Sequence, residues 1–353
     1  MPASASVSVV ICTHRSERFG DFLEAVESLK AQSFTTCGDY VNLDLEIVVV
    51  VDGNRELFER ILKAGVVGQE QGVKTILNEQ NLGLSESRNR GIKEAKGDVI
   101  AFFDDDAVAD KKWLRELLRA YREGEEEVGR VAKLSGAIAA GGKILPMWIS
   151  NSNTKTKSGR PKFLPEEFYW LLGATHKGFA ESEGSGGLVE VRNTFGSNLS
   201  FKAEVLRALG GFRTEMGVKG RRGLLQGEET ELCERMRERF GQGVVYNPAA
   251  VVYHKIYPER LKLRFLLRRA FWQGYSKRMM KEAGSSVSEE EKFVRVLFGG
   301  VVERLKAKSL VAFGQLAVLL LLTSAVGLGY FFKFFKGKKN HKKVKKHKKC
   351  VAE

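Results

Sequence analysis

Apolar runs rich in β-branched residues alternate with stretches of helical periodicity through the first third of the chain. Val7–Cys12, Glu46–Val51 and Val99–Phe103 have the length and composition of buried parallel strands. Between the first two, Phe22–Ala31 carries apolar residues at the spacing of a helix that packs one face on a core. Strands that alternate with helices form a doubly wound sheet. The sequence therefore predicts an α/β fold with a mostly parallel sheet, whose ligands bind at the carboxyl ends of the strands.

Polar side chains follow each of these runs, where the strand is expected to end. Thr13 and Arg15 come after the first run, Asp52 closes the second, and three aspartates, Asp104–Asp106, close the third. Alternate residues of a strand point the same way, so the first and third aspartates can share one divalent cation. Carboxylate oxygens suit Mg²⁺ or Mn²⁺ bound to a substrate diphosphate. A polar turn that caps the next helix is the alternative interpretation.

A second acidic cluster, in Gly227–Leu232, opens a helical pattern that continues to Phe240. Acidic side chains are favoured at a helix N-terminus by the helix dipole, which is one explanation of the cluster. The other is a general base that takes a proton from an acceptor hydroxyl.

Several enzyme classes have no support in the sequence. The chain has no Walker-type phosphate loop, no G-x-G-x-x-G after a strand, and no H-E-x-x-H or G-x-S-x-G motif. Their absence argues against P-loop, kinase, dehydrogenase, metalloprotease and α/β-hydrolase chemistry. The 43% hydrophobic and 29% charged residues are typical of a globular protein. Four cysteines without a C-x-x-C pair predict a reduced, intracellular protein.

The C-terminal third has a different composition. Leu310–Phe332 contains no charged residue and exceeds the roughly 20 residues that a helix needs to cross a bilayer. A buried helix of a soluble protein is the alternative. Before it, residues 259–282 form a basic amphipathic stretch that suits an anionic membrane surface. We expect a catalytic domain over 1–255, membrane-surface helices over 256–305, a membrane-embedded helix over 306–335 and a lysine-rich tail over 336–353.

Positive charge is concentrated at the C-terminal end. Residues 333–353 hold ten lysines and one glutamate, and so contribute most of the formal net charge of +15. Such a run is usually solvated, and it could bind anionic lipid, or nucleic acid without specificity. We expect no specific nucleic-acid partner.

Five segments resemble, in this order, the GT-A glycosyltransferases of family 2: VSVVICTHR, VVVVDGN, NLGLSESRNRGIKEAKGDVIAFFDDDA, GSNLSF…LGGF and GEETELCER. The later runs HKIYPERLKLRFLLRRAFWQGYSKRMM and VGLGYFF are similar to archaeal glucosyl-dolichyl phosphate glucuronosyltransferases. The resemblance to family 2 covers roughly residues 6–240. It implies a Rossmann-like GT-A catalytic domain followed by membrane-associated helices.

The resemblance also implies roles for single residues on the donor side. The uridine would be held by Thr13, Arg15 and Asp52, and Arg88 and Asn89 would lie near the nucleotide. The metal and the diphosphate would be bound by Asp104, Asp106 and His254, with Asp105 facing the ribose or the sugar.

On the acceptor side, Glu229 falls where the family places its catalytic aspartate, and Glu228 and Glu231 are possible substitutes. Asn198 belongs to a segment that borders the acceptor in the family. Arg268 and Arg269, in the basic stretch, are the candidates for the phosphate of a lipid acceptor.

The function implied is an inverting, Mg²⁺- or Mn²⁺-dependent transfer, with UDP-glucuronate as donor and a dolichyl-phosphate-linked sugar as acceptor, in N-glycan assembly. The enzyme would lie at the cell membrane, with its catalytic domain on the cytoplasmic side. Transfer of another hexose, or transfer directly to a polyprenyl phosphate, would use the same motifs. An alternative hypothesis, which does not involve an enzyme, is a non-catalytic membrane anchor that acts through its basic tail.

Overall fold

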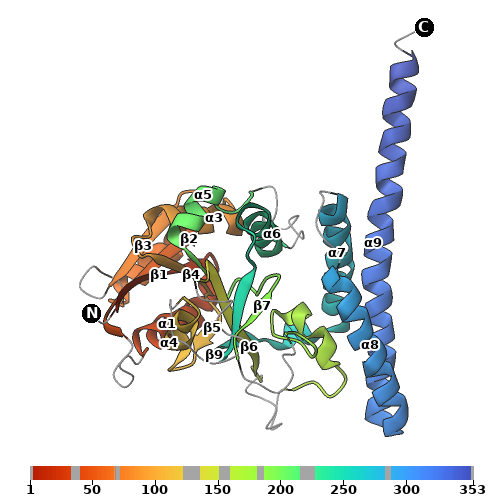
Figure 1. Ribbon diagram of the computed structural model, residues 1–353, viewed down its shortest axis with the longest axis horizontal. Helices are drawn as coiled ribbons and strands as arrows, with labels where there is room; N and C mark the ends of the chain where they lie inside the picture. The colour runs from red at the N-terminus through yellow and green to blue at the C-terminus, as the bar shows by residue number, and fades with distance from the viewer. Residues whose placement is uncertain are drawn as a thin grey trace.

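The computed structural model describes residues 3–32, 40–66, 68, 72–121, 136–150, 160–180, 187–214, 227–282 and 288–350; side chains are described except at 3–5, 40–42, 288–291 and 333–350. It consists of a mixed nine-stranded sheet with helices on both faces, and three long helices stand beside this domain (Figure 1). The predicted α/β fold is confirmed.

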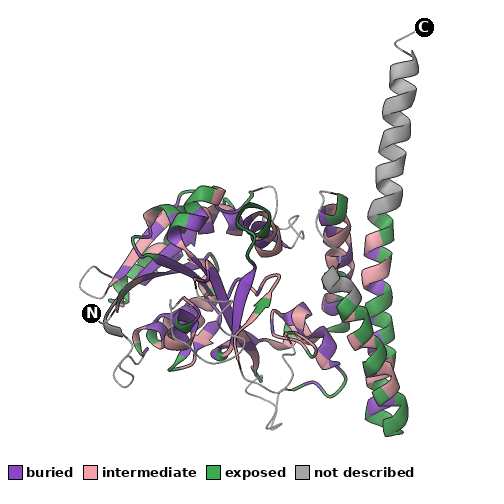
Figure 2. Ribbon diagram, viewed as in Figure 1, coloured by how far each residue is buried: buried purple, intermediate pink, exposed green. Residues whose placement is uncertain are grey.

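The N-terminal half of the sheet is parallel, with strands in the order β3-β2-β1-β4. These strands include the three apolar runs, and they are β1 (Ala3–Thr13), β2 (Tyr40–Asp52), β3 (Val73–Asn78) and β4 (Val99–Asp104). Three helices connect them: α1 (Phe19–Lys30), α2 (Arg55–Lys63) and α3 (Leu84–Glu94). The three apolar runs are buried on both faces of the sheet, which explains why they are apolar almost throughout. Figure 2 shows these strands mostly in the colour of buried residues.

The second half of the sheet is mixed. It contains β5 (Ala107–Ala109), β6 (Ala139–Trp148), β7 (Val189–Val191), β8 (Leu199–Lys202) and β9 (Val244–Ile256). Strand β9 is parallel to β6 and antiparallel to β5. The β5–β9 register sets His254 opposite Ala107, one residue after the three aspartates. The sheet thus brings a histidine from late in the chain to the end of β4.

Shorter elements complete the domain. They are η1 (Ser16–Arg18), α4 (Trp113–Arg119), η4 (Glu166–Leu172), α5 (Ala203–Leu209), α6 (Glu228–Phe240) and η5 (Pro258–Leu261). The weakly periodic stretch 150–190, which predicts a long loop, contains η4, and Glu167 and Phe168 of this element are buried. Residues 151–159 and 181–186 of that stretch lie outside the described residues.

The C-terminal helices are α7 (Leu263–Glu282), α8 (Ser288–Ala307) and α9 (Leu310–Cys350). Helices α7 and α9 approach closely at two glycines: an added Cβ would lie 1.9 Å from the Val326 carbonyl oxygen at Gly274, and 1.8 Å from that of Phe271 at Gly329. The part of α9 from Leu310 to Phe332 is long and apolar enough to cross a membrane. The sequence predicts that the membrane-embedded helix ends at residue 335, whereas α9 continues to Cys350. Residues 351–353 lie outside the described part.

Candidate active site

A cavity of about 2450 Å³ opens at the carboxyl ends of β1, β2 and β4. Its walls include the strand ends, residues of Phe168–Ala180 and Val189–Ser197, the start of α6, and residues of the helices α7, α8 and α9. The alternation of strands and helices in the sequence predicts a ligand site at this edge of the sheet. The C-terminal helices therefore form part of the same cavity as the strand ends.

Two aspartates and a histidine form its acidic centre. One ligand atom from each of Asp104, Asp106 and His254 lies within 4.8 Å of the others. The His254 Nε2 atom is 3.1 Å from Asp106 Oδ1 and 4.0 Å from Asp104 Oδ2. Asp106 and His254 are buried, whereas 35% of the Asp104 side chain is exposed to the cavity. Two carboxylates and an imidazole that converge in this way fit a divalent cation such as Mn²⁺ or Mg²⁺, with Asp104 on the open side.

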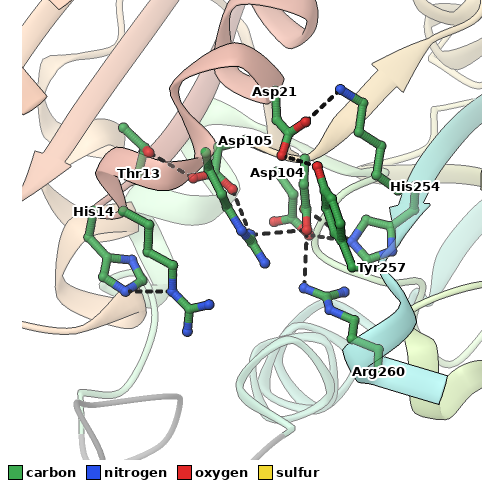
Figure 3. A network of polar contacts seen from close by, with 12 residues as sticks. Thr13, His14, Asp21, Asp104, Asp105, His254, Tyr257 and Arg260 are labelled. Carbon is green, nitrogen blue, oxygen red and sulfur yellow. Dashed lines mark hydrogen bonds and ion pairs between the residues drawn. The ribbon is translucent and has the colours of Figure 1, made fainter. Parts of the chain in front are cut away.

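Basic side chains compensate the buried aspartates (Figure 3). Asp106 Oδ2 lies 3.0 Å from Arg18 Nη1 and 3.1 Å from Arg260 Nη2. Burial opposes ionisation of Asp106, but His254, Arg260 and Arg18 outweigh it and hold the pKa of this carboxyl below its usual range. Asp105 accepts hydrogen bonds from the Thr13 hydroxyl and from Arg18, yet burial raises its pKa to about 6.

The predicted base side is organised by Arg88, a buried residue of α3. Its Nη1 atom lies 3.0 Å from Glu229 Oε1 and 3.6 Å from Glu228 Oε1, and its Nη2 atom lies 3.8 Å from Asp104 Oδ1. One guanidinium therefore joins the metal-binding side to the base side. Gly196 leaves room for it, since a Cβ there would lie 2.2 Å from Arg88 Nη2 and 2.4 Å from Glu229 Oε1.

The three glutamates of the acidic cluster have different surroundings. The Glu229 side chain is 19% exposed and lines the cavity. Glu228 is buried, and burial together with the charge of Glu229 raises its pKa to about 7. Glu231 is held in ion pairs by Arg235 and Arg213 and is not part of the cavity lining. The geometry therefore favours Glu229 as the base, since it pairs with Arg88 and is open to the cavity.

Comparison with known proteins identifies the family. The family model for glycosyl transferase family 2 matches residues 8–167. Over 332 residues the chain is 38% identical to the glucosyl-dolichyl phosphate glucuronosyltransferase of Haloferax volcanii, and the match covers 92% of this chain and 95% of that protein. The chain belongs to glycosyl transferase family 2. It is therefore a glycosyltransferase.

Two solved structures share the fold of this glycosyltransferase. The mannosyltransferase PcManGT from Pyrobaculum calidifontis, in complex with GDP-Man and Mn²⁺, superposes with a TM-score of 0.52 at 14% identity and covers 93% of this chain and 88% of its own. GalNAc-T7 with UDP, GalNAc and Mn²⁺ superposes with a TM-score of 0.50 at 18% identity and covers 82% and 53%. The mixed sheet and its flanking helices accordingly form a GT-A fold.

The predicted nucleotide residues of the transferase line one end of the cavity. Asp52 lies at the end of β2, and its two carboxylate oxygens accept hydrogen bonds from Asn78 and from the main-chain N–H groups of Leu82 and Gly83. Arg15 is exposed, and its Nε donates to His14. Both residues belong to the cavity lining, as does Thr13.

Two predicted residues of the transferase lie outside the cavity lining. The Asn89 side chain donates to the main-chain oxygen of Phe212 and accepts from its N–H. Asn198 is fully buried, donates to the carbonyls of Lys143 and Ala250, and accepts from the Trp113 indole. Both asparagine side chains thus hydrogen-bond to the main chain, and their predicted positions beside the nucleotide and the acceptor stay predictions.

Two arginines of the site were not predicted as site residues. Arg18 follows the first strand by five residues, and the 3-10 helix η1 turns it back towards the aspartates. Arg260 belongs to the basic stretch that predicts a membrane surface, but it faces Asp106. A cluster of three acids requires nearby cations, and this requirement is the signal that could have pointed to them.

Proposed function

We propose that this glycosyltransferase moves glucuronate from UDP-glucuronate to the sugar of a glucosyl-dolichyl phosphate, with inversion at the anomeric carbon. One observation carries the proposal: a carboxylate–imidazole cluster and the base Glu229 line the same cavity, and Arg88 links them. The relative in Haloferax volcanii, whose name gives this donor sugar and acceptor, matches nearly the whole chain and supports the choice of substrates.

The charged side chains of the cavity indicate how the donor would bind. Asp104, Asp106 and His254 would hold a divalent cation, Mn²⁺ or Mg²⁺, which supplies positive charge to the departing diphosphate. Arg18 and Arg260 keep Asp106 ionised, so that it remains a ligand. Thr13, Arg15 and Asp52 lie where the uridine would bind, at the ends of β1 and β2.

The acceptor side supplies the base. Glu229 takes the proton of the acceptor hydroxyl as the new bond between that oxygen and the anomeric carbon forms. The bond between this carbon and the diphosphate breaks on the opposite face, and UDP leaves with the electron pair. A single displacement of this kind converts an α-linked donor into a β-linked product.

The C-terminal helices would keep the cavity at a membrane surface. Helices α7 and α9 both line the cavity, and the apolar part of α9 could anchor the chain in a bilayer. Arg268 and Lys277 of α7 lie on the cavity wall and would attract the acceptor phosphate. Because sugar nucleotides are cytoplasmic, we place the catalytic domain on the cytoplasmic side of the cell membrane.

Release of UDP by full-length protein in detergent tests the proposal. UDP-glucuronate, UDP-glucose and UDP-N-acetylglucosamine are compared with Mn²⁺, each with and without glucosyl-dolichyl phosphate. The proposal expects release with UDP-glucuronate only when the lipid is present. Release with another donor, and not with UDP-glucuronate, would refute the donor assignment but keep the enzyme class.

A further inference from the structure

The arginines of the cavity differ in how their charge is balanced. Arg18, Arg88 and Arg260 each lie within 3.1 Å of a carboxylate oxygen. Arg269 of α7 also lines the cavity, but no carboxylate pairs with it among the residues that the structure describes. Its Nε atom is buried and has no hydrogen-bond partner there. A buried guanidinium N–H without a partner is costly unless a ligand supplies an acceptor, and an anion is the strongest acceptor for it.

A second unsatisfied group lies beside it. Gln273 follows Arg269 by one helical turn and therefore shares its face of α7. It lines the cavity as well, and its buried Oε1 lacks a hydrogen-bond donor in the described part of the chain. The wall of the cavity thus offers a guanidinium that requires an anion and an amide oxygen that requires a hydroxyl or N–H.

The position of this pair points to the donor sugar. Burial and the charge of Arg260 lower the pKa of Arg269 to about 10, although the charges of Glu228, Glu229 and Asp104 act in the opposite direction. Arg269 lines the same cavity as the carboxylate–imidazole cluster and Glu229, and it interacts electrostatically with acidic groups of both. The ring of the donor sugar has to lie between these two, because its anomeric carbon joins the diphosphate to the attacking oxygen.

The chemistry of Arg269 and Gln273 distinguishes between two candidate anions, the phosphodiester of the lipid acceptor and the carboxylate of the donor sugar. The phosphodiester of the lipid acceptor offers oxygens only, and a whole sugar ring separates it from the reacting hydroxyl. A hexuronate carries a carboxylate on ring carbon C5 and a hydroxyl on the next ring carbon, C4, and these two groups would satisfy the guanidinium and the amide together. The planar guanidinium pairs with a carboxylate through two parallel hydrogen bonds.

We propose that Arg269 is the specificity-determining residue that binds the carboxylate of a hexuronate donor, and that Gln273 accepts a hydrogen bond from a hydroxyl of the same ring. This inference rests on the proposed function. The inference assigns Arg269 to the donor side, whereas the sequence predicts it on the acceptor side.

The test measures kcat/KM for UDP-glucuronate and for UDP-glucose in full-length wild type, Arg269→Gln, Arg269→Lys and Arg264→Gln. Arg264 lies exposed on the same helix and outside the cavity lining, so its variant is the matched control. We expect Arg269→Gln to reduce the preference for UDP-glucuronate roughly 10- to 100-fold, the worth of a charged hydrogen bond. Arg269→Lys should restore part of it, and Arg264→Gln should keep it. Binding of UDP alone should be the same in all four proteins.

The other outcomes are distinct. An unchanged donor preference in Arg269→Gln, together with a raised KM for the lipid, would overturn the inference and assign Arg269 to the acceptor phosphate, with the proposed function intact. If wild type itself does not prefer UDP-glucuronate, the proposed function and the inference both fail.

Discussion

At the scale of single residues, Arg88 ties the two halves of the reaction together. Its guanidinium contacts Asp104 on one side and Glu229 on the other, and it lies 5.2 Å from the ring centre of Phe212. Such a buried, fully engaged side chain has few alternative positions. It fixes the distance between Asp104, a proposed metal ligand, and Glu229, the proposed base.

Glu229→Gln should reduce kcat roughly 10²- to 10⁴-fold, because the amide cannot take the proton from the acceptor. Binding of Mn²⁺ and UDP should be unchanged, since Glu229 is on the other side of Arg88 from Asp104. Kinetics of UDP release and calorimetric titration with UDP and Mn²⁺ measure the two effects. Retained turnover would exclude Glu229 as the base and direct attention to Glu228.

Glu228 should make the folded state sensitive to pH. Burial and Glu229 raise its pKa from 4.5 to about 7. The folded state therefore holds this proton more tightly, and its stability falls as the pH rises from about 4.5 to about 7. Glu228→Gln should remove this loss and stabilise the protein at pH 8 by on the order of 2 kcal/mol. Thermal unfolding at pH 5 and pH 8 measures it.

The control is Glu231→Gln, which removes ion pairs with Arg235 and Arg213 and should destabilise the protein at both pH values. If the stability of wild type and of Glu228→Gln depended equally on pH, this result would contradict a raised pKa of Glu228.

At the scale of elements, the sequence predicts more of the first half of the fold than of the second. Val7–Cys12 and Val99–Phe103 lie within β1 and β4, because strand burial on two faces leaves a continuous apolar run. Contacts between distant elements leave no such local pattern. His254 reaches Asp106 across 148 positions through the pairing of β5 with β9. The face of α7 that lines the cavity likewise depends on how α9 packs against it.

Gly274→Ala should separate α7 from α9. The added Cβ would lie 1.9 Å from a main-chain oxygen of α9, which cannot move without the helix. We expect a loss of roughly 1–3 kcal/mol, as for other overpacked positions, together with weaker turnover because α7 lines the cavity. Thermal unfolding in detergent measures the loss. Gly314→Ala on α9, where no atom lies within 4 Å, is the control and should unfold no earlier than wild type; equal melting of the two variants would refute the close packing.

At the scale of the whole molecule, charge and apolar surface gather at the C-terminal end. The lysine-rich tail follows directly on the apolar part of α9. Each basic residue near an anionic surface contributes about 1 kcal/mol to attraction. The residues proposed for metal binding and proton transfer lie in the other part of the chain, in the catalytic domain.

Deletion of residues 336–353 should therefore weaken binding to vesicles that contain phosphatidylglycerol, most strongly at low salt, and leave UDP release in detergent within about two-fold of wild type. Vesicle sedimentation and the release assay measure the two properties. The non-catalytic anchor would show the reverse: loss of function on deletion of the tail and none in Asp104→Asn.

The most direct measurement is the lipid product itself. Full-length protein is incubated with UDP-glucuronate, glucosyl-dolichyl phosphate and Mn²⁺, and the extracted lipid is analysed by mass spectrometry. The account predicts a lipid that is heavier by one glucuronate residue, and its loss with a chelator and in Asp104→Asn. A product that forms equally well with the chelator and in Asp104→Asn would contradict it, as would an unmodified lipid from folded protein that binds UDP and Mn²⁺.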